Sequence, residues 1–147
     1  MMFARMTSAA FATAAAVVLS GCAPTATSVA TNVTGGANMN GGLPSKATIF
    51  YLTSTSAFNS ADYGSLATNP AAALGADLLG SQSVLLRPGE TKMTARSFDG
   101  EGPTAVGVIV GFKAIGSAQW RASTPIKQGG ANTLTVSIGS GSVSISK

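Results

Sequence analysis

Short apolar runs rich in β-branched and aromatic residues recur along most of the chain, separated by glycine, proline, asparagine and serine. Runs of this length bounded by turn residues are typical of β-strands. The predicted strands cover residues 29–34, 47–52, 83–86, 92–98, 104–112, 119–123, 132–138 and 142–146. About eight strands at this spacing predict a mostly β protein folded as a two-sheet β-sandwich. The run 104–112 is the most apolar, so we expect it to be central in its sheet.

One segment departs from this pattern and predicts a small helical insertion at about 58–80. Asn69 offers a capping side chain, and Pro70 suits the first position of a helix. The predicted helix continues through Leu79 and ends at Gly80. Leucines spaced four residues apart give it one apolar face, which we expect to pack on a sheet.

The N-terminus has the parts of an export signal. Arg5 is followed by an uncharged stretch over residues 7–19, which as a helix rises only about 20 Å. A membrane-spanning helix must cross roughly 30 Å, so a cleaved signal is the better interpretation. The stretch ends in Leu19-Ser20-Gly21-Cys22, the pattern of a lipobox, and residues 1–21 are therefore predicted to be a lipoprotein signal peptide.

Cys22 is the only cysteine of the chain, and the nucleophilic thiolate explains why lipid attachment requires this residue type. Several acyl chains on the new N-terminus would give a lasting membrane anchor. Residues 22–28 are then a lipidated N-terminus and tether, and residues 29–147 form the folded domain. Ala23 follows the cysteine where an aspartate would signal retention in the inner membrane of enterobacteria-like lipoproteins, which favours the outer membrane.

The residues that the chain lacks argue against catalysis. It has no histidine, the commonest general base and transition-metal ligand, and the lipid would consume its one cysteine. Asp99 and Glu101 are close in sequence but fall short of a calcium loop, so a turn between strands is the better interpretation. The basic residues are scattered singly and do not indicate a nucleic-acid surface. The sequence predicts no enzyme activity, no metal site and no cofactor.

A glycine-rich segment between the first two predicted strands, residues 35–45, must be a loop. It is longer than most connections between strands, which is typical of functional or mobile loops. Met39 and Leu43 are its apolar members. Either they fold back onto the domain or they contact a partner, and the sequence alone does not decide between these alternatives.

The order of the apolar motifs resembles the TssJ (SciN) lipoproteins of type VI secretion systems. The motifs are Ile49-Phe50-Tyr51-Leu52, Phe58-x-x-Ala61-Asp62-Tyr63-x-x-Leu66, Leu74-Gly75-x-Asp77-Leu78-Leu79, Leu86-Arg87-Pro88-Gly89-Glu90, Val108-x-Val110-Gly111-Phe112 and Gln119-Trp120-Arg121. The resemblance covers nearly all of the chain after the lipobox. It implies a transthyretin-like β-sandwich with a small helical addition.

The resemblance also implies a function without catalysis. Such a protein sits in the outer membrane through its lipid and holds the periplasmic C-terminal region of the inner-membrane protein TssM. In the family the loop between the first two strands contributes to that contact. Here the corresponding partner-binding loop is Asn38, Met39, Asn40, Gly41, Gly42, Leu43 and Pro44. The alternative is an envelope lipoprotein whose sandwich binds glycan or peptidoglycan, for which Trp120 is the one aromatic platform.

Overall fold

The computed structural model describes residues 26–147, so the predicted signal peptide and Cys22 lie outside the described residues. It contains eight strands in the order predicted from the sequence, and the predicted helical insertion holds three short α-helices. The strands are β1 (Thr27–Gly35), β2 (Ser45–Leu52), β3 (Leu78–Leu86), β4 (Thr91–Phe98), β5 (Ala105–Val110), β6 (Arg121–Pro125), β7 (Ala131–Ile138) and β8 (Val143–Ser146). The helical elements are η1 (Met39–Gly42), α1 (Ser56–Ser60), α2 (Tyr63–Thr68), α3 (Pro70–Leu74) and η2 (Gly75–Asp77).

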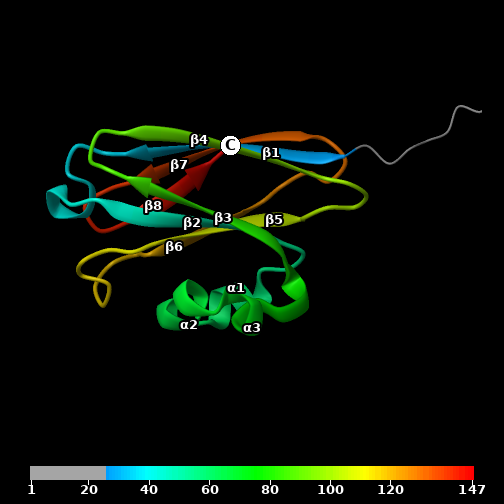
Figure 1. Cartoon of the computed structure of the whole chain (residues 1–147), viewed down its shortest axis with the longest axis horizontal. Helices are drawn as coiled ribbons and strands as arrows, with labels where there is room; N and C mark the ends of the chain where they lie inside the picture. The colour runs from blue at the N-terminus through cyan, green and yellow to red at the C-terminus, as the bar shows by residue number, and fades with distance from the viewer. Residues whose placement is uncertain (1–25) are drawn as a thin grey trace, which may run out of the picture.

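The strands form two four-stranded sheets, ordered β4-β1-β7-β8 and β3-β2-β5-β6. Strands β1 and β7 are parallel, and the other neighbouring strands are antiparallel. Figure 1 shows the two sheets stacked as layers, with the three helices covering the outer side of the β3-β2-β5-β6 sheet. The predicted two-sheet β-sandwich is confirmed.

The main core lies between the two sheets, where the inward-facing residues alternate with outward-facing ones. Strand β5 is buried along its whole length between β2 and β6, as its apolar sequence predicts. The largest core side chain is Tyr51, whose hydroxyl donates a hydrogen bond of 2.9 Å to Gln82 Oε1. Burial raises the pKa of this phenol, so the hydroxyl stays protonated and remains a donor at neutral pH.

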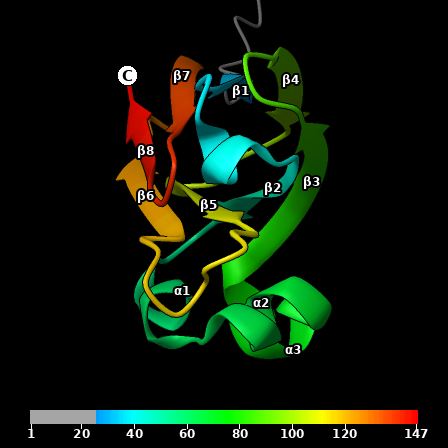
Figure 2. The same cartoon turned by 90° about the vertical axis from the view of Figure 1, so that its left-hand side faces the viewer.

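A second, smaller core holds the helical layer on the sheet. Phe58 of α1 is fully buried against Phe50, with ring centroids 6.1 Å apart, and its ring lies directly over Gly107 of β5. Arg121 of β6 fixes the end of α1, because its Nη1 donates to the carbonyls of Phe58 and Ala61 at 2.8 and 2.7 Å. Figure 2 shows the three helices together at one side of the sandwich.

The helical layer differs from the prediction at its C-terminal end. The capping predicted at Asn69 and Pro70 is present, since Asn69 Oδ1 accepts from the Ala72 amide at 3.4 Å. However, α3 ends at Leu74 and not at Gly80, because Gly75 takes a positive φ of 56° that ends the α-helix. Leu78 and Leu79 belong to β3, so the insertion spans α1 to η2. No helix among residues 26–147 is long and apolar enough to cross a membrane.

Candidate partner-binding surface

The predicted partner-binding loop lies at the end of the sandwich opposite the start of β1. In Figure 1 the short helix η1 is at the far left, whereas the chain enters β1 at the right. The nine residues of β1 span about 30 Å, which sets the distance between these two ends. Backbone hydrogen bonds tie the loop to its surroundings: Gly36 N donates to Ile138 O, and Gly89 N donates to Gly35 O.

Met39 does not belong to the accessible part of the loop. Its side chain is fully buried in the core between the sheets, where it closes the end of the sandwich. A Cβ added at Gly35 would lie 2.6 Å from the Met39 sulfur, so a side chain at Gly35 would compete for the same space. Of the two alternatives left open by the sequence, folding back onto the domain is correct for Met39, and a direct contact with a partner is not.

Asn40 is the residue that holds the loop in place. It has a left-handed φ of 49°, which asparagine tolerates better than most residues, and its side chain is only 7% exposed. Its Oδ1 accepts a hydrogen bond from the Lys113 amide at 2.7 Å, and its Nδ2 donates to Pro44 O at 3.2 Å. Asn40 therefore connects the loop to the segment after β5 and supports the surface from within.

The remaining residues of the predicted loop are exposed. Leu43 keeps 43% of its surface in contact with solvent, and it is one of four large apolar side chains exposed in the described part of the chain. Asn38, Gly41, Gly42 and Pro44 are exposed beside it. For Leu43 the structure therefore leaves the partner-contact alternative open.

A small cavity of about 180 Å³ opens next to η1, and no sequence pattern had indicated it. Its lining residues are Asn40, Gly41, Phe112, Lys113, Ala114, Ser117, Ala118, Ser140 and Gly141. They come from three separate segments, namely η1, the connection after β5 and the β7–β8 turn. The volume is below the roughly 300–1,000 Å³ of small-molecule sites.

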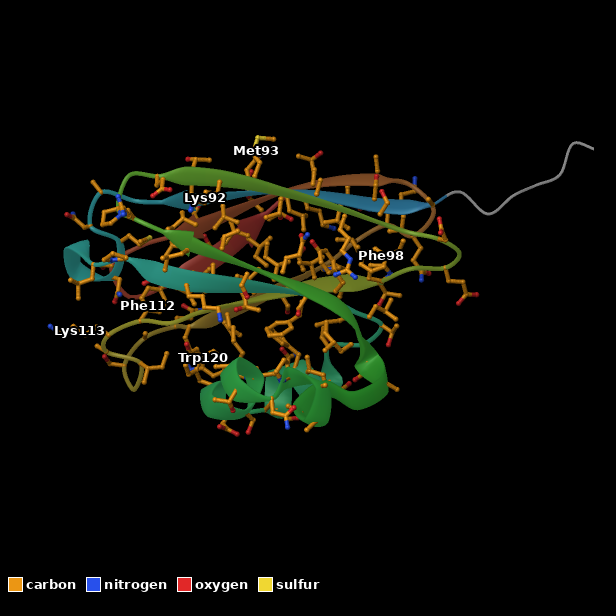
Figure 3. All side chains as sticks on the ribbon, viewed as in Figure 1. Lys92, Met93, Phe98, Phe112, Lys113 and Trp120 are labelled. Atoms are coloured by element: carbon orange, nitrogen blue, oxygen red, sulfur yellow. The ribbon has the colours of Figure 1, made fainter. Side chains whose placement is uncertain are left out.

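The charge at this end of the molecule is predominantly positive. Lys113 is exposed at the cavity and projects away from the sandwich, as Figure 3 shows. Lys46 is the second residue of β2, and Arg87 starts the turn that packs on the loop. The acid of that turn, Glu90, is paired with Lys92 at 3.4 Å. A hydrogen bond from the Arg87 amide, together with Lys92, lowers the pKa of Glu90, which keeps the carboxylate ionised and the turn in shape.

The described residues contain no arrangement that indicates catalysis. No group of three or more histidine, cysteine, aspartate or glutamate residues could hold a metal ion in the part of the chain from 26 to 147. Asp62 has a lowered pKa because Ser65 donates two hydrogen bonds to it, but these bonds cap α2. Asp99 and Glu101 lie in the β4–β5 turn, as predicted.

These observations define a β-sandwich module with a small cavity and exposed loop residues at one end. The chain belongs to the type VI secretion lipoprotein family that includes VasD, EvfM and TssJ, since the family model T6SS-SciN matches residues 27–141. The predicted resemblance is confirmed. The family comprises structural lipoproteins of the secretion system and is not known for enzyme activity.

Solved structures show the same fold. The T6SS lipoprotein TssJ1 from Pseudomonas aeruginosa matches with a TM-score of 0.73 and 26% identity, over 84% of this chain and 95% of that chain. Lip from Serratia marcescens, a membrane-bound component of the type VI secretion system, matches with a TM-score of 0.71 and 22% identity, over 84% and 97%. A chain from a structure described as the T6SS protein TssM C-terminal domain from EAEC matches with a TM-score of 0.67 and 17% identity, over 82% and 98%. A search of curated protein sequences found no significant match.

Proposed function

We propose that this protein is an outer-membrane lipoprotein that tethers the periplasmic C-terminal region of TssM, so that the type VI secretion apparatus is held across the cell envelope. Membership of the type VI secretion lipoprotein family carries the proposal. One of the similar structures is described as the TssM C-terminal domain, which supports TssM as the partner. Lipid attachment at Cys22 supplies the membrane contact.

The placement of the loop fits this role. The tether enters at Thr27, and the loop with its cavity lies about 30 Å away at the other end of β1. A domain anchored at Thr27 can therefore present Leu43 and Lys113 to the periplasm. Because Asn40 and Met39 hold the loop in place, little order has to be gained on binding, which reduces the entropic cost of the contact.

The glycan-binding alternative has less support. Carbohydrate sites of this kind use an exposed aromatic face, and Trp120 is half-buried, with its ring at 5.3 Å and nearly perpendicular to Tyr63. The guanidinium carbon of Arg121 lies 4.4 Å from the Trp120 ring centroid. No aromatic side chain among the described residues is fully exposed.

A charge reversal at the rim of the cavity should weaken binding to TssM. Lys113→Glu places a negative charge where the surface is positive, and Leu43→Asp removes the exposed apolar contact. We expect each change to lower the affinity for the periplasmic region of the TssM of the same bacterium by at least about tenfold, equivalent to roughly 1.4 kcal/mol. Surface plasmon resonance on the mature chain measures this directly.

Asn59→Asp is the matched control, because it adds a negative charge on the exposed side of α1, away from the loop. It should bind TssM like the unchanged protein. Equal affinities for all three variants would contradict the assignment of the loop as the contact. If the unchanged protein itself does not bind TssM, the tethering function is wrong.

Replacing Cys22 by alanine should release the protein from the membrane. Without the thiol no thioether forms, so the acyl chains that anchor the N-terminus are absent. Fractionation of the cells should move the protein from the outer-membrane fraction to a soluble or unprocessed form. Retention of the variant in the outer membrane would show that the anchor lies elsewhere in the chain.

A further inference from the structure

The outer face of the β4-β1-β7-β8 sheet contains no charged residue. Alternation along each strand decides which side chains point outward, and the strand register places them in neighbouring rows. The outward-facing residues are Ser28, Ala30, Asn32 and Thr34 of β1, Thr91, Met93, Ala95 and Ser97 of β4, Ala131, Thr133, Thr135 and Ser137 of β7, and Ser144 and Ser146 of β8. We call this surface the neutral face.

Only 10% of the residues of the chain are charged, and none of them lies on the neutral face. Among residues 26–147 no helix covers it, because the helices lie on the other sheet (Figure 1). The basic residues of β4 point inward: Lys92 donates to Leu85 O, and the guanidinium carbon of Arg96 lies 5.1 Å from the Phe98 ring centroid. Met93 instead projects from the face with 76% of its surface exposed, as Figure 3 shows.

We propose that the neutral face is a contact surface between two copies of this chain in the same membrane. Without the predicted signal peptide and its Arg5, the chain carries eight basic and five acidic residues, so two copies have a net charge of the same sign and repel each other. The neutral face avoids this repulsion. Its small side chains also allow close approach, and hydroxyl pairs such as Thr34 Oγ1 and Thr91 Oγ1, 3.2 Å apart, can exchange hydrogen bonds with a facing copy.

The position of the N-terminus agrees with such a pairing. Two identical faces pack through a two-fold axis that lies in the plane of the contact. When this axis runs parallel to the strands and between β1 and β7, both copies point in the same direction, and both Thr27 residues lie at the same end. Two copies paired in this way can be anchored in one membrane. The register then places Met93 of each copy over the row of Thr135 and Ser146 of the other.

The area of the neutral face indicates a weak pairing that depends on the membrane. Three strands about 25–30 Å long and the shorter β8, about 13 Å long, lie about 4.8 Å apart and present roughly 450 Å² per copy. The total of about 900 Å² is below the roughly 1,000 Å² of a stable specific interface and corresponds to a transient contact. Confinement to a membrane surface raises the effective concentration and favours such a contact. This step rests on the lipid anchor proposed at Cys22.

Cross-linking in vesicles tests the pairing. Thr133 lies beside the expected axis, so Thr133→Cys should join two copies through a short bis-maleimide. Ser83→Cys, on the outer side of the other sheet, is the matched control. The full lipidated chain is reconstituted in phosphatidylethanolamine and phosphatidylglycerol vesicles. Flotation of the same vesicles shows separately whether the protein is attached to the membrane. The unchanged protein, whose only cysteine is Cys22, shows how much cross-linked product comes from a Cys22 thiol without lipid.

We expect at least fivefold more cross-linked dimer for Thr133→Cys than for Ser83→Cys. Adding Ala30→Asp, which places like charges across the axis, should reduce the Thr133→Cys product to the level of the control. Circular dichroism verifies that the variants are folded. Each of three results would overturn the pairing. They are equal cross-linking at both positions, no cross-linked product for Thr133→Cys although the protein floats with the vesicles, and no effect of Ala30→Asp on the amount of product.

Discussion

Replacing Met39 by aspartate is expected to unfold most of the protein, although Met39 lies in a glycine-rich loop. Its side chain is fully buried among core residues of both sheets. The change removes a large apolar side chain, which alone costs about 2–5 kcal/mol, and leaves a carboxylate without a partner in the core. Against a typical stability of roughly 5–15 kcal/mol, we expect a loss of at least about 4 kcal/mol.

Leu43→Asp is the matched control for this prediction, since it makes the same kind of change in the same loop at an exposed position. Surface substitutions usually stay within about 0.5 kcal/mol, so Leu43→Asp should keep the denaturation midpoint while Met39→Asp lowers it strongly. Urea denaturation followed by tryptophan fluorescence gives both values. Similar midpoints for the two variants would mean that Met39 is not a core residue in solution.

The contrast between Met39 and Leu43 shows where sequence reasoning ends. The sequence identified both as apolar residues of an unusual loop, but their directions depend on contacts between distant segments. Asn40 takes its left-handed conformation and bonds to the Lys113 amide, 73 residues away. The bond fixes Asn40 directly beside Met39, whose side chain is buried in the core. No local pattern encodes such a contact, and the cavity next to η1 was missed for the same reason.

The strands could be predicted because their pattern is local. The alternation of apolar and polar residues, together with β-branched residues, predicted the positions of all eight strands, including the buried β5. The helical insertion was less predictable, because Leu78 follows Leu74 at the helical spacing of four residues although it belongs to a strand. Pairing with β2 decides in favour of the strand, since Leu78 lies opposite Leu52 and β3 continues to Leu86. Tertiary pairing therefore overrides the local preference.

Gly107→Ala is expected to destabilise the attachment of the helical layer. A Cβ at this position would lie 2.8 Å from Phe58 Cζ, closer than side chains approach in folded proteins. Phe58 cannot easily move, because it is fully buried and the carbonyl of its own residue is held by Arg121. Overpacking of this kind costs roughly 1–3 kcal/mol. Thermal or urea denaturation measures the loss.

A double-mutant cycle with Phe58→Leu identifies the cause. The smaller side chain leaves room for the added methyl group, so the double variant should lose less stability than the sum of the two single changes. Gly116→Ala is the matched control, because a Cβ there meets nothing within 4 Å. Additive effects of Gly107→Ala and Phe58→Leu would show that the two residues do not compete for space. A coupling free energy of about 1 kcal/mol or more would support the direct contact between Phe58 of α1 and Gly107 of β5.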